Sequence, residues 1–121
     1  PNDVYLYLAR SSIHAVTGNH PAALADREEA VRRRPQAAEA YLARGGTYHE
    51  LGRHEEGLRD RTRAIELSPR LAEAWLARGS AYFLLGDPEK AIPDLERALA
   101  LNPQYEEARS VLARSRAACS G

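Results

Sequence analysis

The amino-acid sequence predicts an all-α protein, an α-solenoid built from antiparallel helix pairs. Its most informative feature is an internal repeat. Shifting the chain by 34 residues aligns 4–37, 38–71 and 72–105 without a gap, and the last two repeats are identical at 16 of 34 positions. Good helix formers dominate each repeat, and a glycine in its middle and a proline near its end interrupt them. A fixed period of this length is typical of helical units that stack side by side.

Each repeat is expected to form two helices separated by a turn. Gly18, Gly52 and Gly86 recur at the same place in the three repeats, where they divide each repeat into two helical stretches. Residues 106–118 follow the third repeat and combine an apolar side with an arginine-rich side, which predicts a C-terminal capping helix. The length suits one domain, so we expect 1–121 to be a single domain. The expected helices lie near residues 3–17, 20–33, 37–51, 54–67, 71–85, 88–101 and 105–118.

Aromatic, small and proline residues also recur at fixed places in each repeat. Their spacing resembles the tetratricopeptide repeat over residues 4–105. The resemblance implies a right-handed superhelix with one concave wall, which is formed by the first helix of each repeat. The residues that carry it are Trp75, Gly79, Tyr82, Ala91, Ala98 and Pro103 in the third repeat; Tyr41, Gly45, Tyr48, Ala64 and Pro69 in the second; and Tyr7, Ala23, Ala30 and Pro35 in the first.

Several positions depart from the family pattern, and one departure recurs in all three repeats. An arginine takes the place of the usual leucine, and an aspartate follows it sixteen residues later with the glycine midway between them. In an antiparallel hairpin, residues equally far from the turn reach the same height, at about 1.5 Å per residue. Opposite charges at one height can form bidentate pairs, although each charge could also face water alone. We expect three structural ion pairs, Arg10–Asp26, Arg44–Asp60 and Arg78–Asp94. The other departures are His14 in place of tyrosine, and Arg27, Arg61 and Leu95 in place of phenylalanine.

No sequence pattern indicates a catalytic, metal or nucleic-acid site. His49, Glu50 and His54 superficially resemble a zinc-protease helix, but the two histidines are about 140° apart around a helix, and Gly52 interrupts it. Seventeen Lys and Arg balance seventeen Asp and Glu, so the charge of a typical nucleic-acid binder is missing. The apolar runs are far shorter than the roughly 20 residues that cross a bilayer. We therefore expect no catalytic residues, no metal, no cofactor, no nucleic-acid partner and no membrane span.

The resemblance to the tetratricopeptide family implies where a ligand would bind, because members of that family commonly bind ligands in the concave wall. Chaperone-binding members hold a C-terminal carboxylate there with Lys, Asn and Arg, and the matching positions here carry Leu8, Ser12, Ala43, Glu73 and Ala77. An extended or helical segment with apolar anchors suits this wall better than an acidic tail. The alternative is that these residues only pack repeat against repeat or face another copy of the chain. The expected groove residues are Leu8, Ser12, Leu42, Gly46, His49, Leu76, Ser80 and Phe83.

These observations predict a non-catalytic protein–protein interaction scaffold that binds a peptide or a partner segment in its groove. Two alternatives stay open. One is a structural module that joins identical copies into a homo-oligomer, and the other is a regulatory arm of a larger enzyme. The single cysteine, Cys119, excludes an internal disulfide and fits a reducing compartment, so a cytoplasmic location is expected.

Overall fold

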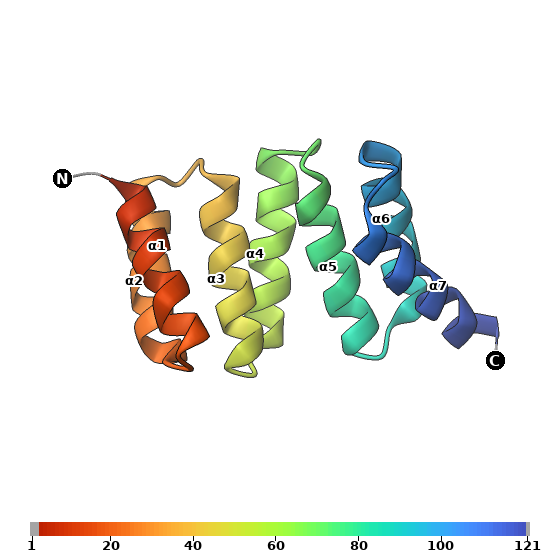
Figure 1. The fold of residues 1–121 in the computed structure, drawn as a ribbon, viewed down its shortest axis with the longest axis horizontal. Coiled ribbons are helices and arrows are strands. Elements are labelled where there is room, and N and C mark those ends of the chain that lie inside the picture. Colours follow the sequence, from red (N-terminus) through yellow and green to blue (C-terminus); the bar gives the residue numbers. More distant parts are fainter. Residues whose placement is uncertain (1–2, 121) are drawn as a thin grey trace. The chain divides into compact units, whose positions relative to one another are not determined.

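The computed structural model describes residues 3–120, and these residues form seven helices and no strand (Figure 1). The all-α prediction is confirmed, and the helix ends lie within two residues of the expected positions. The helices belong to two compact units, Pro1–Leu67 and Ser68–Gly121, which are described separately below, and a single domain over 1–121 stays a prediction. The first unit contains α1 (Val4–Val16), α2 (His20–Arg33), α3 (Ala38–Glu50) and α4 (His54–Leu67); the second contains α5 (Ala72–Leu84), α6 (Pro88–Leu101) and α7 (Glu106–Ser120).

Each turn within a helix pair depends on a glycine. Gly18, Gly52 and Gly86 have φ angles of +83°, +77° and +84°, a conformation that residues with a Cβ rarely adopt. A Cβ built at these positions would meet no atom within 4 Å, so the backbone conformation, and not lack of space, requires glycine. The helix that follows two of these turns is capped by a side chain, because Asn19 accepts from the Ala22 amide and Asp87 from the Lys90 amide.

The turns between repeats are closed by a side-chain contact that no sequence motif indicates. The proline carbonyl of each turn accepts a hydrogen bond from a side chain six residues later, in the first turn of the next helix. The donors are Tyr41 Oη to Pro35 at 3.0 Å, Trp75 Nε1 to Pro69 at 2.8 Å and Arg109 Nη2 to Pro103 at 2.6 Å. The N-cap residues of α3 and α5 make no side-chain cap, so these contacts hold the start of each helix against the preceding turn.

Each unit has its own apolar core. In the first unit, α2 contacts both α1 and α3, and Val4, Ala30 and Ala40 are buried among them with Tyr7 and Leu8 at the edge. The core of the second unit lies between α5, α6 and α7. It comprises Leu76, Ala91, Leu95, Ala98, Ala108, Val111 and Leu112, so α7 supplies three of its seven buried members.

Small residues let α3 and α4 approach closely in the first unit. A Cβ at Gly45 would lie 3.0 Å from the backbone oxygen of Gly57 and 3.2 Å from Asp60 Cβ. A Cβ at the neighbouring Gly46 would meet only Arg61 Nη2, at an ordinary 3.7 Å. The close contact between α3 and α4 therefore requires a glycine at position 45, whereas position 46 has room for a larger side chain.

Alanine substitution should separate these two glycines. We expect Gly45→Ala to lower the free energy of unfolding by about 1 to 2 kcal/mol, because a backbone oxygen cannot move aside and alanine's better helix propensity offsets only part of the overpacking. Gly46→Ala should instead raise it by up to about 1 kcal/mol through helix propensity alone. Urea denaturation followed by circular dichroism measures both values. Equal effects at the two positions would contradict this account of the α3–α4 contact.

Candidate functional site

In the first unit, the predicted groove residues lie on α1 and α3. Leu8, Leu42, Gly46 and His49 are half-buried, and Ser12 is exposed with its hydroxyl donating to the Leu8 carbonyl at 3.1 Å. None of these five side chains carries a formal charge when His49 is neutral. They leave an accessible, mostly apolar surface along the first helices of the first two repeats.

In the second unit, the predicted groove residues lie on α5 and are less accessible. Leu76 is only 6% exposed and belongs to the core of that unit, so it has little surface left for a ligand. Ser80 and Phe83 are half-buried, and Phe83 packs at the edge of the same core. Leu76 therefore occupies the same repeat position as Leu8 and Leu42 but serves mainly to stabilise the helix pair.

A hollow of about 500 Å³ opens between α1, α2 and α3 of the first unit. Its wall is apolar on the α1 side and polar on the other two helices, and Gly46 is the one residue it shares with the predicted groove. No motif in the sequence indicates that the other lining residues form a site. The lining residues are Ala15, Val16, His20, Arg27, Gly46, Thr47 and Glu50.

Arg27 is the most unusual residue of this hollow, because it stands where the family usually has phenylalanine. Its Nε donates to Ser11 Oγ at 2.8 Å, and its Nη1 donates to the Ala43 carbonyl at 3.2 Å and to Thr47 Oγ1 at 2.5 Å. One guanidinium thus joins three helices. All three acceptors are uncharged, and burial lowers the pKa of Arg27 below its usual value. A cation held only by neutral groups favours an additional acceptor, such as a peptide carbonyl, at this wall.

Two histidines meet at the turn between α3 and α4. His49 Nδ1 and His54 Nδ1 lie 2.9 Å apart, because the Gly52 turn brings the end of one helix to the start of the next. Burial lowers the pKa of His49 to about 4, with the nearby charges of Arg61 and His54 as smaller causes, so its imidazole is neutral at pH 7. A Cβ at Gly57 would lie 2.7 Å from the His49 ring, so this ring needs a glycine opposite it.

A metal site does not form around these histidines in the part of the chain that the structure describes. His20 Nε2 lies 3.9 Å from Glu50 Oε2 at the rim of the hollow, and both groups are separate from the His49–His54 contact. Over residues 3–120, no three His, Cys, Asp or Glu side chains are grouped so that they could hold a metal ion. Over the same residues, none of the helices has the length and apolar character needed to cross a lipid bilayer.

The three Arg–Asp contacts join the two helices of each pair and are bidentate in each repeat. Nε and Nη2 of each arginine donate to the two carboxylate oxygens at 2.6 to 2.9 Å. The aspartates are buried throughout, but Arg10 is 63% exposed whereas Arg44 and Arg78 are 21% and 20% exposed. The hydrogen bond from Arg10 lowers the pKa of Asp26, and the one to Asp60 raises the pKa of Arg44.

The chain is a repeat protein built from helix pairs. Each pair has a glycine turn and an ion pair, and a proline precedes the helix that follows it. Within that class, the chain belongs to the tetratricopeptide repeat family, whose models match residues 8–60 and 72–105. The resemblance that the sequence predicts is therefore confirmed, and with it the solenoid of helix pairs.

Solved structures show the same fold. The first tetratricopeptide domain of Spaghetti (RPAP3), bound to the HSP90 peptide SRMEEVD, is 23% identical, with 98% of this chain and 94% of that chain covered and a TM-score of 0.91. The second such domain of human RPAP3, in complex with the HSP70 peptide SGPTIEEVD, is 23% identical over 93% and 98%, with a TM-score of 0.82. The OM64 domain of Arabidopsis is 24% identical over 93% of both chains, with a TM-score of 0.87. No curated protein sequence matches this chain.

Proposed function

We propose that this chain is a non-catalytic protein-interaction scaffold that binds an apolar, uncharged segment of a partner on the α1–α3 surface of its first unit. The observation that carries the proposal is the row of accessible, uncharged residues on the two first helices, Leu8, Ser12, Leu42 and Gly46. The hollow beside them adds the Arg27 guanidinium, which is suited to donate a hydrogen bond to a backbone carbonyl of an extended segment.

The solved relatives support a peptide as the kind of ligand, since two of them were determined with bound peptides. Both of those peptides end in the acidic sequence EEVD. Here the positions that correspond to the carboxylate-holding Lys, Asn and Arg carry uncharged residues or, at Glu73, an acid. In the first unit these positions carry no cation, and the Glu50 carboxylate lines the hollow beside them, so a like charge disfavours an acidic tail and an apolar segment is the better fit.

To test this, peptides that bind the 121-residue chain are selected from a random peptide display library. The selected peptides are then labelled, and their affinity for the chain is measured by fluorescence anisotropy. We expect the selected peptides to be apolar, and we expect Leu42→Lys to weaken their binding by about tenfold or more because it places a charge in the middle of the surface. Leu84→Lys is the matched control, since Leu84 is 81% exposed on α5, and it should leave affinity unchanged.

The labelled peptide SRMEEVD completes the experiment. It should bind no more tightly than a scrambled version of itself, because the chain lacks the cationic residues that would hold its carboxylates. Tight binding of SRMEEVD, or selected peptides that bind Leu42→Lys as well as they bind the unchanged chain, would overturn the proposed ligand class and surface. The alternative that this chain is a regulatory arm of a larger enzyme stays a prediction, and this experiment does not test it.

A further inference from the structure

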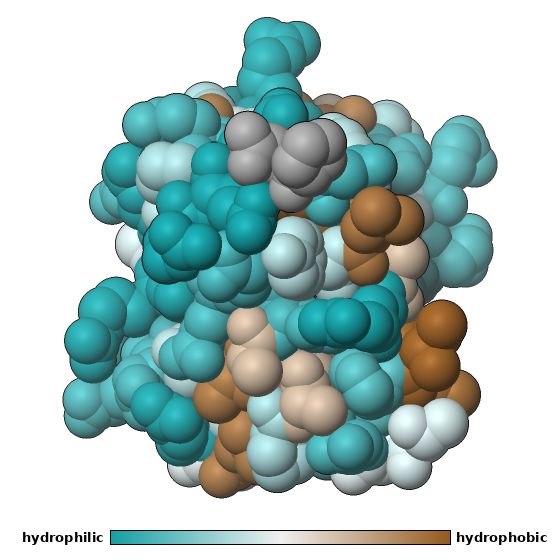
Figure 2. All heavy atoms as spheres, turned by 90° about the vertical axis from the view of Figure 1, so that its left-hand side faces the viewer, coloured by the Kyte–Doolittle hydropathy of each residue, from teal (hydrophilic) through white to brown (hydrophobic). Residues whose placement is uncertain are grey.

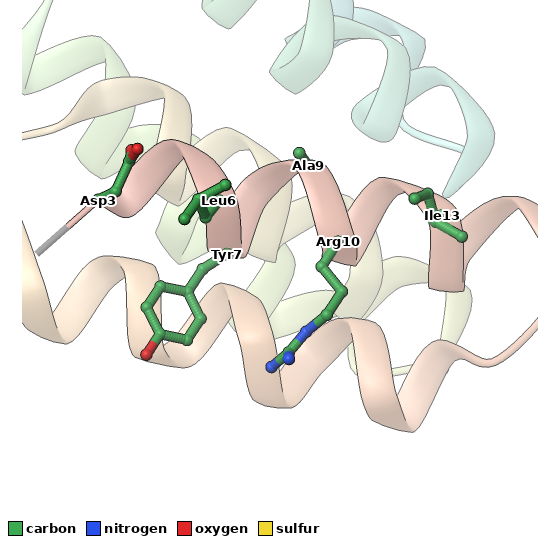
Figure 3. Close-up of a pocket in the computed structure, with 6 residues that line it drawn as sticks. All are labelled: Asp3, Leu6, Tyr7, Ala9, Arg10 and Ile13. Carbon is green, nitrogen blue, oxygen red and sulfur yellow. The ribbon is translucent and has the colours of Figure 1, made fainter. Parts of the chain in front are cut away.

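The first helix exposes a row of apolar residues beside the proposed groove, and Val16 at the end of this row also lines the hollow between α1, α2 and α3. Leu6, Ile13 and Val16 are 67%, 64% and 88% exposed, and Ala9 between them is exposed as well. Figure 3 shows Leu6, Ala9 and Ile13 along one side of α1, while Tyr7 and Arg10 leave it on another side. Figure 2 views the side of the first unit where α1 lies, and brown side chains interrupt its hydrophilic surface. We call these four residues, Leu6, Ala9, Ile13 and Val16, the α1 seam.

Two residues of the α1 seam, Leu6 and Ile13, occupy the repeat positions through which the other first helices pack on their neighbours. One repeat later, Ala40 and Thr47 hold the positions of Leu6 and Ile13, and they are 0% and 1% exposed where α3 packs on α2. In the second unit, Ala108 and Ser115 of α7 hold the same positions and are both 0% exposed. Leu6 and Ile13 are thus in register with an established helix-packing face, which indicates that their occupant is a helix.

The residue sizes argue against an occupant that packs as α2 packs on α3. That contact uses alanine and threonine, whereas the seam has leucine and isoleucine at the same places, and these larger side chains would hold a neighbouring helix farther away. The seam residues instead recur at spacings of three, four and three, which is the spacing of a coiled-coil interface. Such an interface needs a partner helix that places a large side chain opposite the small Ala9.

We propose that a second copy of this chain covers the seam, with the two α1 helices packed antiparallel about a two-fold axis. In that arrangement Leu6 faces Val16 of the second copy, and Ala9 faces Ile13 of the second copy, so each layer combines a larger with a smaller side chain. A parallel pair would place Ala9 against Ala9 and leave a hole in the middle of the interface. The antiparallel pair also aligns the two helix dipoles favourably.

Charge and polarity favour this isologous pairing over a head-to-tail stack. The seam itself carries no charge, and the chain has no net charge, so repulsion between copies is small. The exposed side of α7 carries Arg109, Arg114 and Arg116 and only alanines as apolar residues, so it offers little apolar surface on which the seam of another copy could pack. Two helices of 13 residues bury less than the roughly 1,200 Å² of a standard interface, so we expect a weak dimer with a dissociation constant above about 1 µM.

Sedimentation equilibrium of the 121-residue chain tests the pairing. From a few micromolar to several hundred micromolar, the mass should rise from 13.4 kDa toward twice that value. The double variant Leu6→Glu with Ile13→Glu should stay monomeric with unchanged helicity, because both side chains are exposed in the monomer. Leu84→Glu removes an even more exposed leucine, 81% exposed on α5, and should dimerise like the unchanged chain.

Disulfide trapping tests the orientation. In a Cys119→Ser background, Ala9→Cys and Ile13→Cys chains mixed in equal amounts should form a cross-linked heterodimer faster than either chain cross-links with itself. A monomer at every concentration would overturn the proposal and leave the seam to a different protein. A dimer that survives Leu6→Glu with Ile13→Glu, or masses that continue beyond two copies, would overturn it as well. Faster self-linking at position 9 would reject the antiparallel arrangement.

Discussion

Asp60→Ala should lower the free energy of unfolding by about 2 to 4 kcal/mol, one of the largest losses that a single substitution in this chain can cause. Asp60 accepts two hydrogen bonds of 2.7 Å from Arg44, and the side chains are only 8% and 21% exposed. Removing the carboxylate leaves the guanidinium between the rings of Tyr41 and Tyr48, with little access to water. An uncompensated charge in that place is costly, although residual hydration of Arg44 keeps the loss below that of full burial.

The double variant Arg44→Leu with Asp60→Ala should be more stable than Asp60→Ala alone. It removes the orphan charge and restores the leucine that the family usually has at this position, and replacing a buried ion pair by apolar groups is often close to neutral. Urea denaturation followed by circular dichroism gives the values for a double-mutant cycle. Additive effects at the two positions would contradict a coupled pair.

Asp26→Ala is the matched control for this experiment. Asp26 makes the same bidentate contact with Arg10, but Arg10 is 63% exposed, so water solvates the arginine once its partner is gone. We expect a clearly smaller loss than for Asp60→Ala. If the two aspartate variants lose equal stability, the exposure of the arginine does not set the cost of breaking the pair.

Ending the chain at residue 104 should destabilise it by about 3 to 6 kcal/mol and make it associate. The deletion removes Val111 and Leu112, which are 6% and 5% exposed in the core of the second unit, and burial of each such side chain is worth about 1.5 to 3 kcal/mol. It also uncovers Leu76 and Leu95, which then form an apolar patch. Thermal unfolding and light scattering measure the two effects.

A point variant separates the loss of core packing from the loss of a whole helix. Leu112→Ala should cost about 2 to 4 kcal/mol, because it leaves a cavity between α6 and α7. Ser110→Ala on the exposed side of the same helix should change stability little. An unchanged melting temperature for the shortened chain, together with a monomeric mass, would show that α7 does not cap the second unit.

The features that the sequence alone determined are those that depend on distance along the chain. Helix formers and the 34-residue period placed the helices, and recurring glycines marked the turns that need a positive φ. The contact between Arg44 and Asp60 follows from equal spacing on both sides of Gly52, because a hairpin fixes which residues share one height. These relations hold within one helix pair and need no knowledge of what lies next to it.

Only the tertiary structure decided which positions are covered and which side chains meet. Leu76 and Leu42 have the same place in their repeats, yet Leu76 lies in a core and Leu42 stays partly accessible, because burial depends on the neighbouring helices. Arg27 became a link between three helices, a role that its position in one helix pair does not reveal. Leu6 and Ala40 likewise share a position, and only the helix packed against Ala40 makes one buried and the other exposed.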